Sequence, residues 1–111
     1  MNILTEKANR AVVLHVKEKR LDAHNSGEFK SRVTRLIEEG NTHLIIDLGD
    51  VSFIDSSGLG ALLSGYKNVS SHQGSLILSG LQSQVQSLFE LTRLHRVFKI
   101  YPSLEEAMSN T

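Results

Sequence analysis

The residues best suited to chemistry form a run of four, Asp55, Ser56, Ser57 and Gly58, between an apolar segment and an amphipathic one. Short Asp and Ser side chains accept hydrogen bonds from the unpaired backbone N–H groups that begin a helix. A serine hydroxyl there lies near the surface, beside amide donors and about half a positive charge, which suits a phosphate group. Ser56 is therefore a candidate for a modified serine. The alternative is that Ser56 and Ser57 are helix caps and nothing more.

Two neighbouring segments must position this turn. Residues 43–48 contain a nearly continuous apolar run, which is typical of a strand covered on both faces. Residues 58–70 are predicted to form a helix, because apolar side chains recur there at helical spacing. These side chains are Leu59, Leu62, Leu63 and Tyr66. Gly58 and Gly60 are poor helix formers, so their presence in the first turn indicates a close approach by another segment.

The rest of the chain alternates strands and helices. Further strands are predicted over residues 3–5, 11–16, 75–79 and 97–100, and further helices over 23–39, 82–92 and 104–108. Residues 6–10 are expected to be a hairpin connection, and residues 17–22 a charged, solvated loop with one apolar anchor. This alternation implies right-handed crossovers. The prediction is one α/β domain over residues 1–111, with a mostly parallel mixed sheet of four to five strands and about four helices packed on it.

Composition argues against several classes of partner. Twelve basic and twelve acidic side chains give a net charge of zero, so no overall field favours nucleic acid or an anionic membrane. With four Phe, two Tyr and no Trp, the chain has few rings on which bases could stack. No cysteine is present for disulfides or thiolate metal sites. No run approaches the ~20 apolar residues of a membrane span, and the N-terminus lacks a signal segment. We expect a cytoplasmic protein.

An enzymatic role for the serines is disfavoured by their neighbours. A nucleophile elbow of the type G-x-S-x-G needs small residues on both sides of the serine, whereas Ile54 and Asp55 precede Ser56. The five histidines lie on separate elements without zinc-site spacing. They are His15, His24, His43, His72 and His95. We expect no enzyme, metal or cofactor. A small serine hydrolase remains the alternative, to be tested by labelling Ser56 with a fluorophosphonate.

The segment LIIDLGDVSFIDSSGLGALLSGYK, residues 44–67, resembles the signature of the bacterial anti-sigma factor antagonists. These are stand-alone members of the sulfate transporter and anti-sigma factor antagonist (STAS) domain family. The order of elements matches that family from about residue 12 to residue 108. The resemblance implies a partner-switching regulator. Its partners would be a protein serine kinase with an ATP-binding fold, which is the anti-sigma factor or an equivalent, and a metal-dependent serine phosphatase.

The resemblance also implies roles for individual residues. The phosphorylated serine is Ser56, and Asp55 orients its turn. Asp22 matches a Leu-Asp pair in a loop beside that turn, although Lys19 stands where the family usually has glycine. Lys19 and Arg20 are expected to influence which kinase is recognised. The expected partner-binding surface is Asp22, Asp55, Ser57, Gly58 and Leu59. The alternative is a STAS subunit of a transporter complex that carries no regulatory phosphate.

Overall fold

The computed structural model describes all residues from 1 to 111, and a five-stranded sheet organises them. The strand order is β1-β2-β4-β6-β7; β1 is antiparallel to β2, and every other neighbouring pair is parallel. The strands are β1 Ile3–Ala8, β2 Ala11–Val16, β4 His43–Asp47, β6 Ser75–Ser79 and β7 Lys99–Tyr101. This confirms the predicted mostly parallel mixed sheet. Two short strands, β3 Arg20–Leu21 and β5 Phe53–Ile54, pair with each other outside it.

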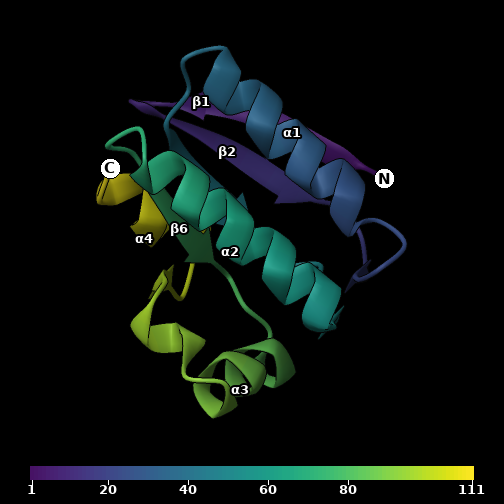
Figure 1. Ribbon diagram of the computed structural model, residues 1–111. Coiled ribbons are helices and arrows are strands. Elements are labelled where there is room, and N and C mark those ends of the chain that lie inside the picture. Colours follow the sequence, from purple (N-terminus) through teal and green to yellow (C-terminus); the bar gives the residue numbers. More distant parts are fainter.

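Helices cover both faces of the sheet. They are α1 Ser26–Glu38, α2 Ser56–Ser70, α3 Ser83–Leu91 and α4 Leu104–Ser109, with a 3-10 turn, η1, at Leu94–Arg96. Figure 1 shows α1 and α2 side by side on one face, α4 on the other, and α3 beyond the edge of the α2 layer. No helix is both long enough and apolar enough to cross a membrane.

The apolar residues of the central strands alternate between two cores. On β4, Leu44 and Ile46 belong to the larger core beneath α1 and α2, where Phe29 and Leu62 are fully buried. Ile45 points the other way and belongs to the smaller core that includes Ala107 of α4. Because successive side chains of a strand point to opposite faces, a continuous apolar run fits a strand covered on both sides.

The predicted hairpin between the first two strands is confirmed, but its connection is shorter than residues 6–10. Strand β1 continues to Ala8, and only Asn9 and Arg10 form the turn. Asn9 has φ 58°, in the left-handed region that asparagine adopts more readily than most residues. The end of β1 is predicted as a polar loop because Glu6 and Lys7 are charged; both are exposed on this edge strand.

Several other predicted boundaries also differ from the structure. The loop predicted over 17–22 contains β3, whose Leu21 is fully buried. Helix α1 begins at Ser26 instead of residue 23, because a turn with two hydrogen bonds between Asp22 and Asn25 precedes it. Helix α2 begins two residues earlier than predicted. The last strand is displaced to 99–101 because η1 precedes it.

Candidate functional site

Asp55 fixes the turn that leads into α2. It is the N-cap residue, with extended backbone (φ −98°, ψ −174°), and its Oδ1 atom accepts a hydrogen bond from the backbone N–H of Gly58 at 2.9 Å. Its Oδ2 atom accepts a second from the backbone N–H of Ala23 at 3.2 Å. The helix is therefore capped by Asp55, and the interpretation of Ser56 and Ser57 as caps is wrong.

Ser56 is the first residue of α2 and is exposed to solvent, as is Ser57. The hydroxyl of Ser56 takes part in none of the side-chain hydrogen bonds of the structure, which include the cap made by Asp55. The first N–H groups of a helix lack partners within it, and they concentrate partial positive charge. The 15-residue helix thus presents a free hydroxyl at an end that tolerates an anion.

Gly58 lets β3 approach the first turn of α2. A Cβ atom at Gly58 would overlap the carbonyl oxygen of Leu21 and would lie 2.8 Å from Cγ2 of Ile54. The predicted close approach is therefore confirmed at Gly58. It is wrong at Gly60, where an added Cβ would meet no atom within 4 Å. Leu59, the next residue after Gly58, is half-buried and packs against the larger core.

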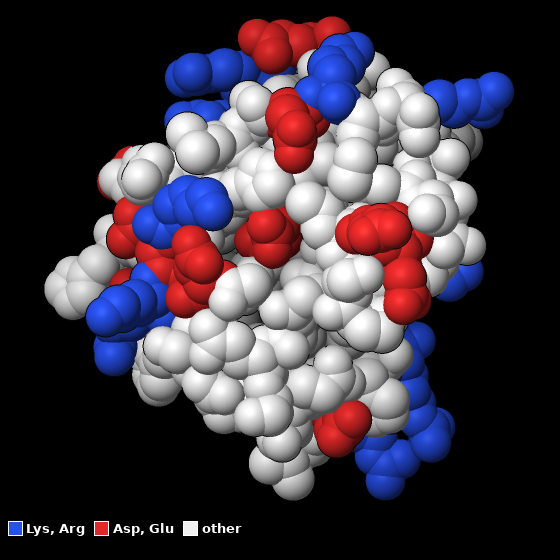
Figure 2. Space-filling view, turned by 180° about the vertical axis from the view of Figure 1, so that it is seen from behind, with Lys and Arg blue, Asp and Glu red and all other residues white.

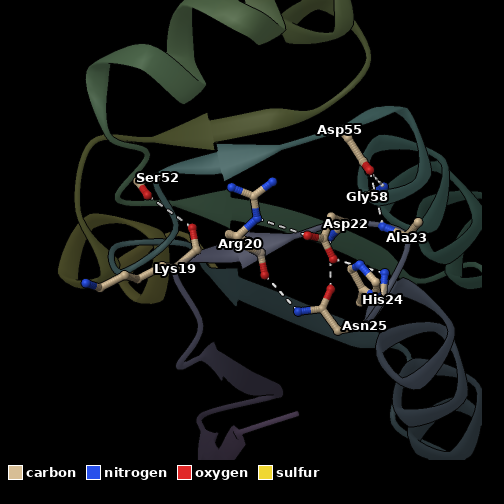
Figure 3. A network of polar contacts seen from close by, with 9 residues as sticks. All are labelled: Lys19, Arg20, Asp22, Ala23, His24, Asn25, Ser52, Asp55 and Gly58. Atoms are coloured by element: carbon tan, nitrogen blue, oxygen red, sulfur yellow. Dashed lines mark hydrogen bonds and ion pairs between the residues drawn. The ribbon is translucent and has the colours of Figure 1, made fainter.

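The segment before α1 is bonded to the segment before α2 (Figure 3). The carbonyl oxygen of Lys19 accepts hydrogen bonds from the backbone N–H groups of Ser52 at 2.8 Å and Phe53 at 3.2 Å, and from Oγ of Ser52 at 3.2 Å. The carbonyl oxygen of Leu21 accepts one from the N–H of Asp55 at 3.3 Å. Residues 19–22, expected to be a solvated loop, are thus held along the strand that leads to Ser56.

Asp22 lies within this network, with only 10% of its side chain exposed. Its Oδ2 atom accepts a hydrogen bond from Nε of Arg20 at 3.1 Å, and its Oδ1 atom accepts one from the backbone N–H of His24 at 3.0 Å. The hydrogen bond from Arg20 lowers the pKa of Asp22 below its ordinary value, against an opposing effect of desolvation; the N–H of His24 adds to the lowering. Asp22 therefore carries a negative charge next to Ala23, the residue bonded to Asp55.

Sequence reasoning missed the contact between Arg20 and Phe53. These residues are partners in the β3–β5 pairing, and the guanidinium carbon lies 4.1 Å from the centre of the ring. Phe53 is 42% exposed although it is large and apolar. Strands of two residues are too short to show a periodic pattern, so no signal in the sequence identified this pair.

A second polar cluster, which the sequence did not reveal, joins three strands on the face of the sheet that points away from α1 and α2. Nδ1 of His15 lies 2.7 Å from Oδ2 of Asp47, and Nε2 lies 2.6 Å from Oε1 of Glu6. Burial lowers the pKa of His15, but the hydrogen bonds to the two carboxylates and their negative charges together outweigh it and raise that pKa above its ordinary value. Figure 2 shows this face, where acidic and basic side chains are interspersed.

The carboxylates of this cluster approach different nitrogens of the His15 ring, so the three groups do not converge on one point. No group of three acidic or histidine side chains in the structure could hold a metal ion. An ionised carboxylate only accepts hydrogen bonds, so the ring can donate to two ionised carboxylates at once only in its protonated, imidazolium form. Through these side-chain contacts the cluster links β1, β2 and β4.

Comparison with known proteins identifies the family. Residues 2–107 match the model of the STAS domain. The anti-sigma-B factor antagonist of Bacillus subtilis is 34% identical over 80 residues, which are 72% of this chain and 72% of that protein. The crystal structure of TM1081 from Thermotoga maritima, 29% identical, covers 97% of this chain and 92% of that one with a TM-score of 0.89.

The Bacillus protein SpoIIAA, solved in its phosphorylated form, shares the fold. It has a TM-score of 0.77 and 24% identity, and the match covers 98% of both chains. The resemblance noted in residues 44–67 is thus confirmed at the level of family and fold. The chain belongs to the STAS domain family, and anti-sigma factor antagonists are among its relatives by sequence.

Proposed function

We propose that this protein is a cytoplasmic anti-sigma factor antagonist whose partner is switched by phosphorylation of Ser56. With Ser56 unmodified, it binds a protein serine kinase with an ATP-binding fold, which is the anti-sigma factor or an equivalent. Phosphorylation by that kinase releases it, and a metal-dependent phosphatase restores the binding form. The observation that carries the proposal is the exposed, unbonded hydroxyl of Ser56 at the start of α2, in a chain with such relatives.

The position of Ser56 supports a modification that leaves the fold intact. The hydroxyl supports no hydrogen bond that the phosphate would have to break, and the N-terminus of α2 offsets part of the added charge. The turn itself is held by Asp55 and by its contacts with Gly58 and Ala23. The phosphate therefore acts on what docks there more than on the protein that bears it.

The surroundings of Ser56 support repulsion at an interface. A phosphate group adds about −1.5 to −2 charge at neutral pH. Asp55 is adjacent, and Asp22, whose pKa is lowered by Arg20, belongs to the same bonded network. A partner covering this surface would have to bury added negative charge. A 100-fold loss of affinity corresponds to only about 2.7 kcal/mol, within the cost of an unpaired buried charge.

A structural neighbour supports the existence of two phosphorylation states. SpoIIAA, which shares the fold, has been solved in phosphorylated and unphosphorylated forms.

In this chain no histidine is hydrogen-bonded to the hydroxyl of Ser56 in a way that would activate it as a nucleophile. This favours a protein that is modified and bound over one that catalyses a reaction.

The test uses the protein and a candidate ATP-binding serine kinase from the same cell. The two are mixed with Mg-ATP, the modified residue is identified by mass spectrometry, and the dissociation constant is measured before and after modification. We expect one phosphate, on Ser56, and at least about a 100-fold loss of affinity. Ser57→Ala, which changes the neighbouring exposed serine, should still be modified on Ser56, whereas Ser56→Ala should bind without modification. Phosphate on another residue, or unchanged affinity, would overturn the proposal.

A further inference from the structure

We infer that Arg20 is the residue with which this protein recognises an acidic side chain of its partner kinase. The inference rests on the proposed function and names the chemistry of the partner: a carboxylate that docks against the Arg20 guanidinium beside the Ser56 turn.

Two contacts orient the guanidinium before any partner arrives. Nε of Arg20 donates a hydrogen bond to Oδ2 of Asp22 at 3.1 Å, and the guanidinium carbon lies 4.1 Å from the centre of the Phe53 ring. The Arg20 side chain nevertheless remains 61% exposed. Its Nη groups take part in no ion pair of the structure, because the single pair made by Arg20 uses Nε. The planar fork is thus pre-ordered with free donors, which lowers the entropy cost of binding a carboxylate.

The charges around Arg20 favour an acidic partner over a basic one. Lys17, Lys19 and Arg20 line a shallow hollow of about 580 Å³, together with Glu18, Asp22, His24 and Asn25. The two acidic side chains of the hollow are already engaged: Glu18 accepts the backbone N–H of Asn2 at 2.7 Å, and Asp22 binds Arg20. Lys17 is paired with Asp50 at 3.6 Å. The cationic groups of the hollow that take part in no ion pair are the Lys19 ammonium and the Nη donors of Arg20.

Arg20 is also connected to the switch. It pairs with Phe53, which lies three residues before Ser56, and the next residue on β3 accepts the N–H of Asp55. Arginine is enriched among the few residues from which interfaces obtain most of their binding energy. A partner that covers Ser56 and extends along β5 would therefore bury Arg20 and Phe53. It would also remove water from the ion pair between Arg20 and the partner's carboxylate.

The test compares binding of the partner kinase to wild type, Arg20→Ala, Arg20→Lys and Lys19→Ala. Lysine keeps the charge but loses the planar fork and the stacking on Phe53. We expect Arg20→Ala and Arg20→Lys each to weaken binding about tenfold or more, and Lys19→Ala, in the same hollow, to weaken it less than about threefold. Urea unfolding curves that show all four proteins folded under the binding conditions check that the fold is retained.

A double-mutant cycle then identifies the carboxylate. Each surface Asp and Glu of the kinase is replaced by Ala and titrated against wild type and Arg20→Ala. Replacing one of these acidic residues should reduce wild-type affinity about tenfold or more, yet have little effect when Arg20 is already absent.

The inference is overturned if Arg20→Lys binds like the wild type, or if no acidic residue is coupled to Arg20. If the wild type does not bind the kinase, the proposed function fails as well; if phosphorylated Ser56 releases the kinase while Arg20 variants bind normally, only the inference fails.

Discussion

The carboxylate of Asp55 joins the first turn of α2 to the segment before α1, because its Oδ2 atom accepts the backbone N–H of Ala23 at 3.2 Å while Oδ1 caps the helix. Two loops that are distant in sequence are thereby held together at the place where Ser56 is exposed.

Replacing Asp55 should loosen both loops. Loss of an N-cap lowers the free energy of unfolding by about 0.5–2 kcal/mol. The loss in Asp55→Ala is expected near the upper end of this range, because the hydrogen bond to Ala23 is lost as well. Asp55→Asn keeps an oxygen for the cap and should cost less. Urea denaturation of the two variants measures the difference. An Asp55→Ala protein as stable as the wild type would show that this carboxylate does not fix the turn.

Gly58 and Gly60 form a matched pair for testing the contact between β3 and α2. Gly58→Ala places a methyl group against the Leu21 carbonyl, and such overpacking costs typically about 1–3 kcal/mol of stability. Gly60→Ala meets open space and should instead gain up to about 1 kcal/mol from the better helix propensity of alanine. Thermal unfolding distinguishes the two. Equal effects of both substitutions would contradict the packing described here.

The cluster of His15, Glu6 and Asp47 predicts a pH dependence of stability. The pKa of His15 is raised in the folded protein above the value of 6.5 expected for the unfolded chain, so the folded state binds this proton more tightly. The stabilisation is complete below pH 6.5 and is lost as the pH rises through the folded-state pKa. The urea midpoint should therefore decline as the pH is raised above 6.5.

The control for this effect is Glu6→Gln, which removes one carboxylate from an exposed edge strand. The pKa of His15 should fall in this variant, as followed by NMR titration of the ring, and the decline of the urea midpoint should shrink. A His15 pKa at or below 6.5 in the wild type would rule out the charged bridge.

Charge at position 56 should leave the fold stable. Ser56→Ala removes a hydroxyl without a hydrogen bond, and Ser56→Asp places a negative charge at a helix N-terminus, where such charges stabilise by about 0.3–1 kcal/mol. We expect urea midpoints at or slightly above the wild-type value for Ser56→Asp. A large loss of stability in Ser56→Asp would indicate that phosphorylation acts by unfolding α2 rather than by repelling a partner.

Much of the fold could be predicted from the sequence, because long elements carry a periodic pattern. The stripe at Phe29, Val33, Leu36 and Ile37 locates α1, and the apolar run ending at Leu48 locates the centre of the sheet. Strands β3 and β5 could not be predicted, since two residues show no period and their pairing depends on chain segments far apart in sequence. The same limit hid the Arg20–Phe53 contact. The sequence left open whether Ser56 and Ser57 are caps, because Asp and Ser are both good N-cap residues and only the backbone shows which of them stands at the boundary.

The most direct test of the switch compares one protein in two states of Ser56. Unmodified and stoichiometrically phosphorylated chains are titrated by calorimetry with the partner kinase, with urea midpoints measured on both. We predict that the phosphorylated chain unfolds at the same or a higher urea concentration, yet binds at least about 100-fold more weakly. Equal affinities for the two states would contradict the central claim that charge on Ser56 determines whether the partner stays bound.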